Sequence, residues 1–187
     1  MKPMFAHARR ARRPFLYCNQ VGGNDELIFD GQSFALDGRG RVLAQAQGFK
    51  EDLILVDTDK KGGSGARPLP DIAEVQRALE LGIRDYAAKC GFKKVFVGLS
   101  GGIDSALVCA LAALALGPEN VTGVSMPSPY SSPGSLSDAK ALAKNLGIRY
   151  LTLPITGLFK SYLKTLGKFL SSREPGLAEQ NIQARIR

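Results

Sequence analysis

Short apolar runs bounded by polar and turn residues make up most of residues 14–57. Runs of this length and composition are typical of β-strands. The turn sequence DGRG at residues 37–40 lies between two of these runs, so we expect a hairpin there. A sheet this small cannot bury both of its faces, which indicates a part of a larger domain. The runs are PFLYCNQ, QSFALD, RVLAQAQ and DLILVD.

Residues 58–70, TDKKGGSGARPLP, interrupt this pattern with Lys, Gly, Ser and Pro and are typical of a linker. Beyond them, apolar residues return at helical spacing, and we expect a helix over residues 72–89 that Asp71 caps. The predicted domains are therefore residues 1–57 and residues 71–187. One stripe of the expected helix carries the apolar residues Ile72, Val75, Leu79, Ile83 and Tyr86.

Helices and strands alternate through the rest of the chain. Buried-strand patterns at residues 93–99, 120–126 and 148–154 enclose one helix that ends near Leu116 and another from about Leu136 to Asn145. This alternation favours an α/β fold in which a parallel sheet has helices on both faces. Two more helical segments follow, at about residues 155–167 and 178–187.

Positive charge is concentrated at the start of the chain. The 187 residues carry a formal net charge of +8, and the first 20 hold five basic residues and no acidic one. No aromatic residues alternate with these arginines, as a platform for nucleic-acid bases requires. We therefore expect a solvated helix face and no nucleic-acid partner. The five basic residues are Lys2, Arg9, Arg10, Arg12 and Arg13.

The remaining composition narrows the class of protein further. No uninterrupted run of 18 apolar residues is present, so we expect no membrane span. The three cysteines, Cys18, Cys90 and Cys109, have no paired or metal-ligand spacing, and the single histidine, His7, leaves little for a zinc site. We expect a reducing, cytoplasmic setting and structural roles for the cysteines.

The hexapeptide SGGIDS, residues 100–105, lies where a predicted strand ends and a helix begins. In an open parallel sheet this edge binds ligands. Gly101 and Gly102 permit close approach of the backbone and a positive φ, and the helix N-terminus with the hydroxyls of Ser100 and Ser105 favours an anion. We therefore expect a phosphate site, although the chain has neither a Walker A lysine nor a GxGxxG spacing here.

A bare aspartate among phosphates would repel them, so we expect Asp104 to hold Mg²⁺ that bridges to the phosphate oxygens. The alternative is that Asp104 and Ser105 only cap the helix. SGGIDS resembles the signature of the PP-loop ATP pyrophosphatases, which implies that ATP is cleaved between its α- and β-phosphates. By that resemblance, ATP contacts Gly98, Leu99, Ser100, Gly101, Gly102, Ile103, Asp104 and Ser105.

Two further stretches resemble the NAD⁺ synthetases. GVSMPSPYSSPGSLSDAKALAKNLGI is similar to their second βα unit, which implies that Met126 holds the adenine of ATP. AEQNIQARIR is similar to their deamido-NAD⁺ segment, which implies binding roles for Asn181 and Arg185. Core packing of Met126 and a solvated basic helix end stay open as alternatives. Pro129 and Pro133 depart from the family pattern, and we expect them to stiffen the ATP loop and remove two backbone donors.

Residues 17–46 resemble the late portion of the αββα nitrilase-type glutaminase domain that precedes the synthetase domain in glutamine-dependent NAD⁺ synthetases. The resemblance implies ATP-dependent amidation of deamido-NAD⁺, with ammonia from glutamine, in a homo-oligomer. It also implies a fragment without the glutaminase triad and without the later synthetase strands, so we expect no glutamine hydrolysis by this chain. A non-catalytic ATP-binding remnant and a PP-loop tRNA-modifying enzyme stay open as alternatives.

Overall fold

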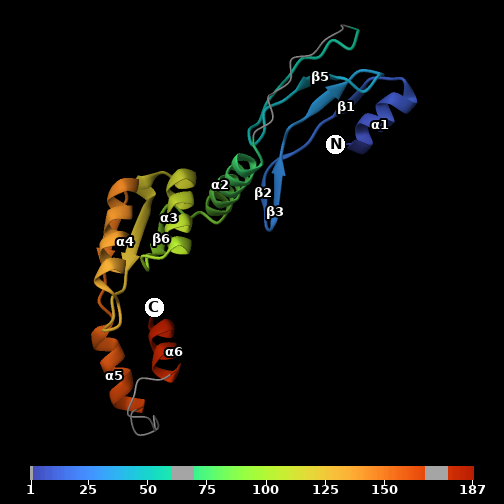
Figure 1. The fold of residues 1–187 in the computed structure, drawn as a ribbon. Helices are drawn as coiled ribbons and strands as arrows, with labels where there is room; N and C mark the ends of the chain where they lie inside the picture. Colours follow the sequence, from blue (N-terminus) through green and yellow to red (C-terminus); the bar gives the residue numbers. More distant parts are fainter. Residues whose placement is uncertain (1, 60–69, 167–176) are drawn as a thin grey trace. The chain divides into compact units, whose positions relative to one another are not determined.

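The computed structural model describes residues 2–59, 70–166 and 177–187, and the chain forms two compact units that divide after Gly91 (Figure 1). Most of the predicted linker lies outside the described residues. The domain boundaries that we expect from composition, with their division at residues 58–70, stay a prediction.

The first unit contains a three-stranded antiparallel sheet in the order β1-β4-β5, with helix α1 packed against it. The aromatic ring of Phe34 is at the centre of this core and lies near the rings of Phe5 and Tyr17. Fully buried Leu36 and Ala8 complete it. The elements are α1 (Lys2–Ala11), β1 (Phe15–Tyr17), β4 (Phe34–Leu36) and β5 (Val42–Gln45).

The predicted hairpin turn between β4 and β5 is confirmed. The Asp37 carboxylate accepts the backbone N–H groups of Arg39 and Arg41, each at 2.8 Å. The Arg41 amide and then the Arg39 amide lower the pKa of the Asp37 carboxyl. Gly40 supplies the positive φ of +71° that the turn requires. The N-terminal basic segment also forms the expected helix, with Arg9 and Arg10 exposed on α1.

A second antiparallel hairpin, β2 (Val21–Asn24) with β3 (Leu27–Asp30), packs against helix α2 (Asp71–Lys89) within the first unit. The Asp85 carboxylate accepts the N–H of Gly23 at 2.8 Å, and the Lys89 ammonium donates to the carbonyl oxygen of the same glycine. A Cβ at Gly82 would lie 2.9 Å from Cδ1 of Ile28, so the hairpin packs closely on the helix at this glycine.

Two expectations for the first unit are wrong. The run DLILVD forms no strand, because it has no partner strand among the described residues, and Leu55 is 95% exposed. Pro70 takes the N-cap position of α2, so Asp71 is the first helical residue and makes no cap. The apolar stripe lies on a helix as predicted and is largely exposed, whereas Leu81 and Ala87 of α2 are buried. The exposed members of that stripe are Ile72, Val75, Leu79 and Tyr86.

The second unit has the α/β fold that the alternating pattern predicts, with a parallel sheet in the order β6-β7-β8 flanked by helices. The core that α3 and α4 form with the sheet includes Cys109, Val121 and Ala139. Phe96 points away from this core and is 71% exposed. The elements are β6 (Val95–Gly98), α3 (Ile103–Leu116), β7 (Val121–Ser125), α4 (Pro133–Leu146), β8 (Arg149–Thr152), α5 (Thr156–Leu166) and α6 (Leu177–Ile186).

The described helices include none that combines the length and the apolar character of a membrane span.

Candidate functional site

The loop between β6 and α3 depends on one glycine in a left-handed conformation. Gly101 has a φ of +84°, whereas Gly102 is extended with a φ of −89° and forms the N-cap of α3. The expectation that both glycines adopt a positive φ is therefore correct for Gly101 and wrong for Gly102. Because an extended backbone is open to any residue, only Gly101 is required by its dihedral angles.

Gly101 also brings the loop against the first turn of α4. A Cβ at this position would lie 2.4 Å from the carbonyl oxygen of Ser135 and 2.6 Å from its Cα. No side chain fits in that space. The contact places the N-terminus of α3 beside the N-terminus of α4, where two helix dipoles favour negative charge.

Two serine hydroxyls hold the loop in shape. Oγ of Ser100 accepts the N–H of Gly102 at 3.1 Å, and Oγ of Ser105 donates to the Gly102 carbonyl oxygen at 2.9 Å. The two hydroxyl oxygens are 3.1 Å apart. The amides of Ile103, Asp104 and Ser105, in the first turn of α3, have no acceptor within that helix. The arrangement is a preformed cradle for an anion.

Asp104 is exposed in the first turn of α3, next to these amides. The described part of the chain has no cluster of three or more His, Cys, Asp or Glu residues that could hold a metal ion alone. Mg²⁺ in nucleotide sites takes one or two carboxylates and completes its shell with phosphate oxygens and water. A single exposed carboxylate beside an anion cradle fits that donor set.

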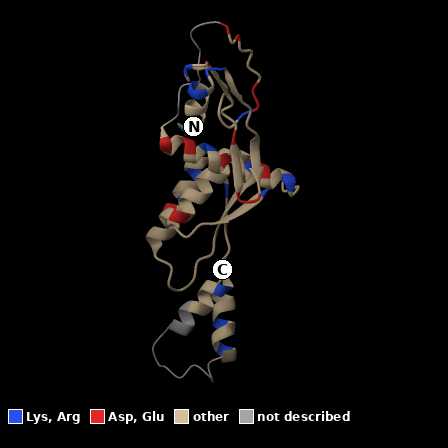
Figure 2. Ribbon diagram, turned by 90° about the vertical axis from the view of Figure 1, so that its right-hand side faces the viewer, with Lys and Arg blue, Asp and Glu red and all other residues tan. Residues whose placement is uncertain are grey.

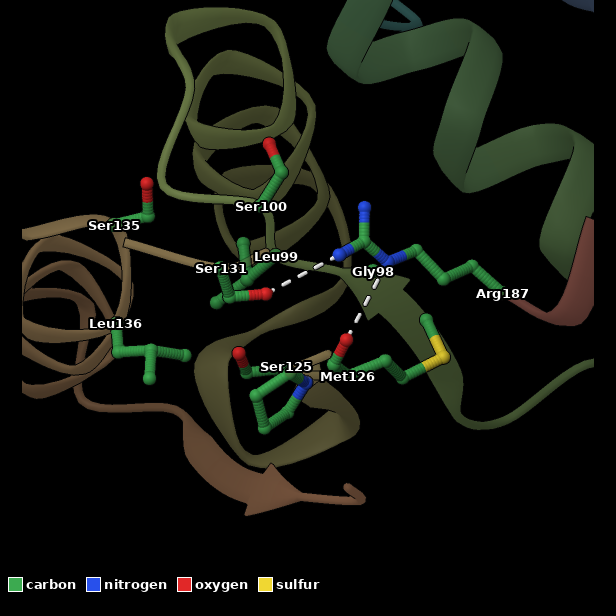
Figure 3. A pocket seen from close by; sticks show the side chains of 10 residues that line it. Gly98, Leu99, Ser100, Ser125, Met126, Ser131, Ser135, Leu136 and Arg187 are labelled. Atoms are coloured by element: carbon green, nitrogen blue, oxygen red, sulfur yellow. Dashed lines mark hydrogen bonds between the residues drawn. The ribbon is translucent and has the colours of Figure 1, made fainter. Parts of the chain in front are cut away.

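A cavity of about 230 Å³ opens where β6 and β7 end (Figure 3). The strand ends contribute Gly98 and Met126, and Arg187 reaches the cavity from the end of α6. Nε of Arg187 donates to the Met126 carbonyl oxygen at 3.4 Å, and Nη2 donates to Oγ of Ser131 at 3.3 Å. The lining consists of Gly98, Leu99, Ser100, Ser125, Met126, Pro127, Ser131, Ser135, Leu136 and Arg187.

The structure brings some of the sequence-predicted residues together and separates others. Gly98, Leu99, Ser100 and Met126 line the cavity. A second concavity between α3 and α4 is lined by Leu99, Gly101, Gly102, Ile103 and Ser105. Asn181 and Arg185 are exposed on α6 and do not line the cavity in the described part of the chain.

The sequence analysis did not identify several of the residues that line the cavity. Ser125 and Pro127 could have been identified, because the end of one parallel strand lies beside the end of its neighbour. Ser131, Ser135 and Arg187 could not, since their place depends on how α4 and α6 pack.

The two prolines differ in their effect on the neighbouring loop. Pro133 is the first residue of α4, a position whose N–H has no acceptor within a helix, so the donor that this proline removes costs the helix no hydrogen bond. Ser132 caps the helix by accepting the N–H of Ser135 at 3.1 Å, and α4 therefore begins three residues before the predicted start at Leu136. Pro129 is exposed, and its effect on nucleotide binding stays a prediction.

None of the three cysteines is among the residues that line the cavity in the described part of the chain. Cys18 follows β1 instead of lying within the strand, and both Cys18 and Cys90 are exposed. Cys109 is buried in α3, and burial raises the pKa of its thiol. A buried thiol with a raised pKa is inert, as expected for a structural residue.

Comparison with known proteins finds two sequence-family models that match successive parts of the chain. The sequence model described as NAD synthase matches residues 75–187, and the model described as carbon-nitrogen hydrolase matches residues 4–67. A glutamine-dependent NAD(+) synthetase of Synechocystis sp. is 49% identical over 96% of this chain and 33% of its own length. The corresponding protein of Thermotoga maritima is 44% identical over 91% of this chain and 36% of its own length.

The structural comparison agrees with the sequence comparison. The glutamine-dependent NAD⁺ synthetase from Acinetobacter baumannii, solved in complex with ADP, has a TM-score of 0.92 and 39% identity over 99% of this chain and 36% of that chain. The chain spans about a third of the length of the curated relatives it matches.

Proposed function

The chain belongs to the NAD synthase family, and on that premise we propose that its second unit binds ATP for the amidation of deamido-NAD⁺ to NAD⁺. One observation carries the proposal: the cavity at the ends of β6 and β7 adjoins the anion cradle at the start of α3. An adenine and a chain of phosphates need these two features side by side. The related structure in complex with ADP supports a nucleotide of this class.

In the proposed complex the adenine lies in the cavity that Gly98 and Met126 line at the ends of their strands. The phosphates then lie on the amides of residues 103–105 and the hydroxyls of Ser100 and Ser105. Neutral donors in a preformed arrangement replace the lysine of a Walker loop, because the pyrophosphate must leave as well as bind.

The proposed reaction has two steps. A carboxylate oxygen of the nicotinate group attacks the α-phosphorus of ATP, the bond to the bridging oxygen breaks, and pyrophosphate leaves. Ammonia then attacks the activated carbonyl carbon, AMP leaves, and a proton is lost from nitrogen to give the amide. The amides and serine hydroxyls of the loop stabilise the charge on the departing pyrophosphate. Asp104 would hold Mg²⁺, which would neutralise phosphate charge when bound.

The dinucleotide is expected on α6. Asn181 offers an amide and Arg185 a guanidinium, which suit a carboxylate, an amide or a phosphate of deamido-NAD⁺. Figure 2 shows basic residues on α5 and α6, which include Lys160, Lys164 and Arg185. Because α5 packs against α6, the basic residues of these two helices favour an anionic ligand.

We propose that ammonia supply and oligomer formation belong to longer proteins of this family, of which this chain spans about a third. The first unit matches part of the carbon-nitrogen hydrolase family, which supports a glutaminase origin for residues 4–67. The proposed partners are therefore deamido-NAD⁺, ATP and ammonia or glutamine, in a homo-oligomer. The proposed division of the chain at residues 58–70 follows the same assignment.

Exchange of labelled pyrophosphate into ATP by the 187-residue chain tests the proposal. The first step is reversible, so exchange that requires both Mg²⁺ and deamido-NAD⁺ is the expected result. Calorimetric titration with ATP in the same buffer separates binding from chemistry. ATP binding without exchange would support a non-catalytic ATP-binding fragment, and tRNA binding that weakens with salt would support the tRNA-modifying alternative.

A further inference from the structure

The last helix presents two polar pairs on nearly opposite faces. At about 100° per residue, Asn181 and Arg185 lie on one face of α6, and Gln183 and Arg187 lie on the other. Gln183 is half-buried, whereas Asn181, Arg185 and Arg187 are exposed, so the contacts of Gln183 and Arg187 distinguish the two faces. The backbone N–H of Arg187 donates to the carbonyl oxygen of Gln183, which continues the helical turn to the end of the chain's described part.

The Gln183 and Arg187 face contacts the segment at residues 126–131. Arg187 donates to the Met126 carbonyl oxygen and to the Ser131 hydroxyl. With the Gln183 amide oriented to satisfy its neighbours, its nitrogen donates to Oγ of Ser128 at 3.2 Å and its oxygen accepts from Nη2 of Arg187 at 3.0 Å. Gln183 and Arg187 therefore form one hydrogen-bonded clasp on this segment.

The clasped segment is also held from its other side. The N–H of Ile155 donates to the carbonyl oxygen of Pro127 at 2.9 Å, and the ring of Tyr130 lies edge-on to Phe159 of α5 with 5.8 Å between ring centroids. Within the segment, Oγ of Ser131 accepts the N–H of Ser128 at 2.9 Å. The hydroxyl that shapes the segment is thus the one to which Arg187 donates.

From these contacts we infer that Gln183 and Arg187 are positioning residues that couple an adenine nucleotide in the cavity to the placement of Asn181 and Arg185. A nucleotide beside Met126 fixes the backbone of residues 126–131, and the clasp fixes α6 against it. The face of α6 that carries Asn181 and Arg185 then loses less conformational entropy when deamido-NAD⁺ binds. The coupling is reciprocal, so each ligand raises the affinity for the other by the same factor. This inference rests on the proposed function, since it requires both ligands.

Hydrogen exchange of the full chain without ligand tests the clasp itself. Arg187→Gln and Gln183→Leu are expected to raise the exchange rates of amides in α6 and in residues 128–131 by about tenfold, the factor that a hydrogen bond from a charged donor is worth. Arg149→Gln is the matched control, because Arg149 is an exposed arginine at the start of β8. Gln183→Leu keeps a side chain of similar volume and good helix propensity, so it separates loss of the clasp from loss of the helix. Unchanged exchange in both variants would overturn the clasp.

Calorimetry with both ligands tests the coupling. The affinity of the wild-type chain for deamido-NAD⁺ is expected to rise about fivefold or more when ATP and Mg²⁺ are present. Arg187→Gln is expected to bring this ratio close to one, and Arg149→Gln to leave it unchanged. A ratio that survives in Arg187→Gln while both ligands still bind would overturn the coupling and leave the proposed function standing. A wild-type chain that binds no ATP would overturn the proposed function and the coupling together.

Discussion

Gly101 lies so close to Ser135 that a Cβ on the glycine would be 2.4 Å from the serine carbonyl oxygen. The first turn of α4 therefore closes against the loop that precedes α3. The substitution Gly101→Ala adds both this clash and the strain of a φ of +84° in a residue with a Cβ. We expect it to destabilise the second unit by about 2 kcal/mol or more and to abolish ATP binding.

Urea unfolding and calorimetric titration with ATP measure these two effects. Gly134→Ala is the matched control, because a Cβ at Gly134 meets only Oγ of Ser132 at 3.9 Å. Normal stability and normal ATP affinity in Gly101→Ala would show that the loop does not need this close approach.

Removal of one hydroxyl is expected to loosen the anion cradle. In Ser105→Ala the Gly102 carbonyl oxygen and the Ser100 side chain each lose a partner. We expect ATP affinity to fall by about tenfold, because one lost hydrogen bond is worth roughly that factor. Titration of the variant with ATP measures the change. Ser137→Ala removes a comparable exposed hydroxyl, which donates to the Gly134 carbonyl oxygen, and is expected to bind ATP normally.

The metal dependence of ATP binding should depend on Asp104. The wild-type chain is expected to bind ATP more tightly with Mg²⁺ than with EDTA, and Asp104→Asn is expected to lose that difference. Asp71→Asn is a suitable control, since Asp71 is also an exposed aspartate in the first turn of a helix. Titration with ATP under both conditions decides the matter, and an unchanged Mg²⁺ effect in Asp104→Asn would exclude Asp104 as a ligand.

Asp85 is expected to stabilise the first unit. Its carboxylate accepts the N–H of Gly23, and Asp85→Ala leaves that half-enclosed amide without its partner. We expect a loss of about 1–2 kcal/mol in the free energy of unfolding, measured with urea. Glu80→Ala removes a carboxylate whose hydrogen bond, among the described residues, comes from Gln76 on the same helix, and it should change stability by less than about 0.5 kcal/mol. Equal losses in the two variants would contradict a role for the Gly23 contact.

The three thiols should differ in reactivity. Burial raises the pKa of Cys109, so less of its thiolate is present at a given pH than for an exposed thiol. A thiol reagent at pH 8 is expected to label Cys18 and Cys90 rapidly and Cys109 only after unfolding in urea. Mass spectrometry of the labelled chain identifies the sites, and rapid labelling of Cys109 in the native chain would show that α3 opens readily.

Structural features that depend on neighbouring residues in the sequence could be predicted well. The loop at residues 100–105 is fixed by its own glycines and serines, so its place between β6 and α3 could be predicted. The β2–β3 hairpin could not, because the glycines in VGGN conceal the alternation and the pairing depends on α2 packing over it. DLILVD has the apolar composition of a strand, yet composition alone supplies no partner strand to pair with.

Arg187 shows the corresponding limit for the site. Its side chain reaches the cavity only because α6 lies against residues 126–131, and nothing in the spacing of ARIR distinguishes it from Arg185. Tertiary packing, and not helical periodicity, selects which of the two arginines enters the cavity.

The parallel register of the second unit also sets the order in which this site can form. Val95 pairs with Val121, and Thr122 pairs with Arg149, so each pairing must wait until the whole helix between the strands has closed back on the sheet. Such distant pairings are slow steps in folding. The cavity needs the ends of both β6 and β7 and the first turn of α4, so it exists only after these steps are complete. The fraction of chains able to bind a nucleotide at a given time during refolding would therefore report how many have completed the last stage of folding of this unit.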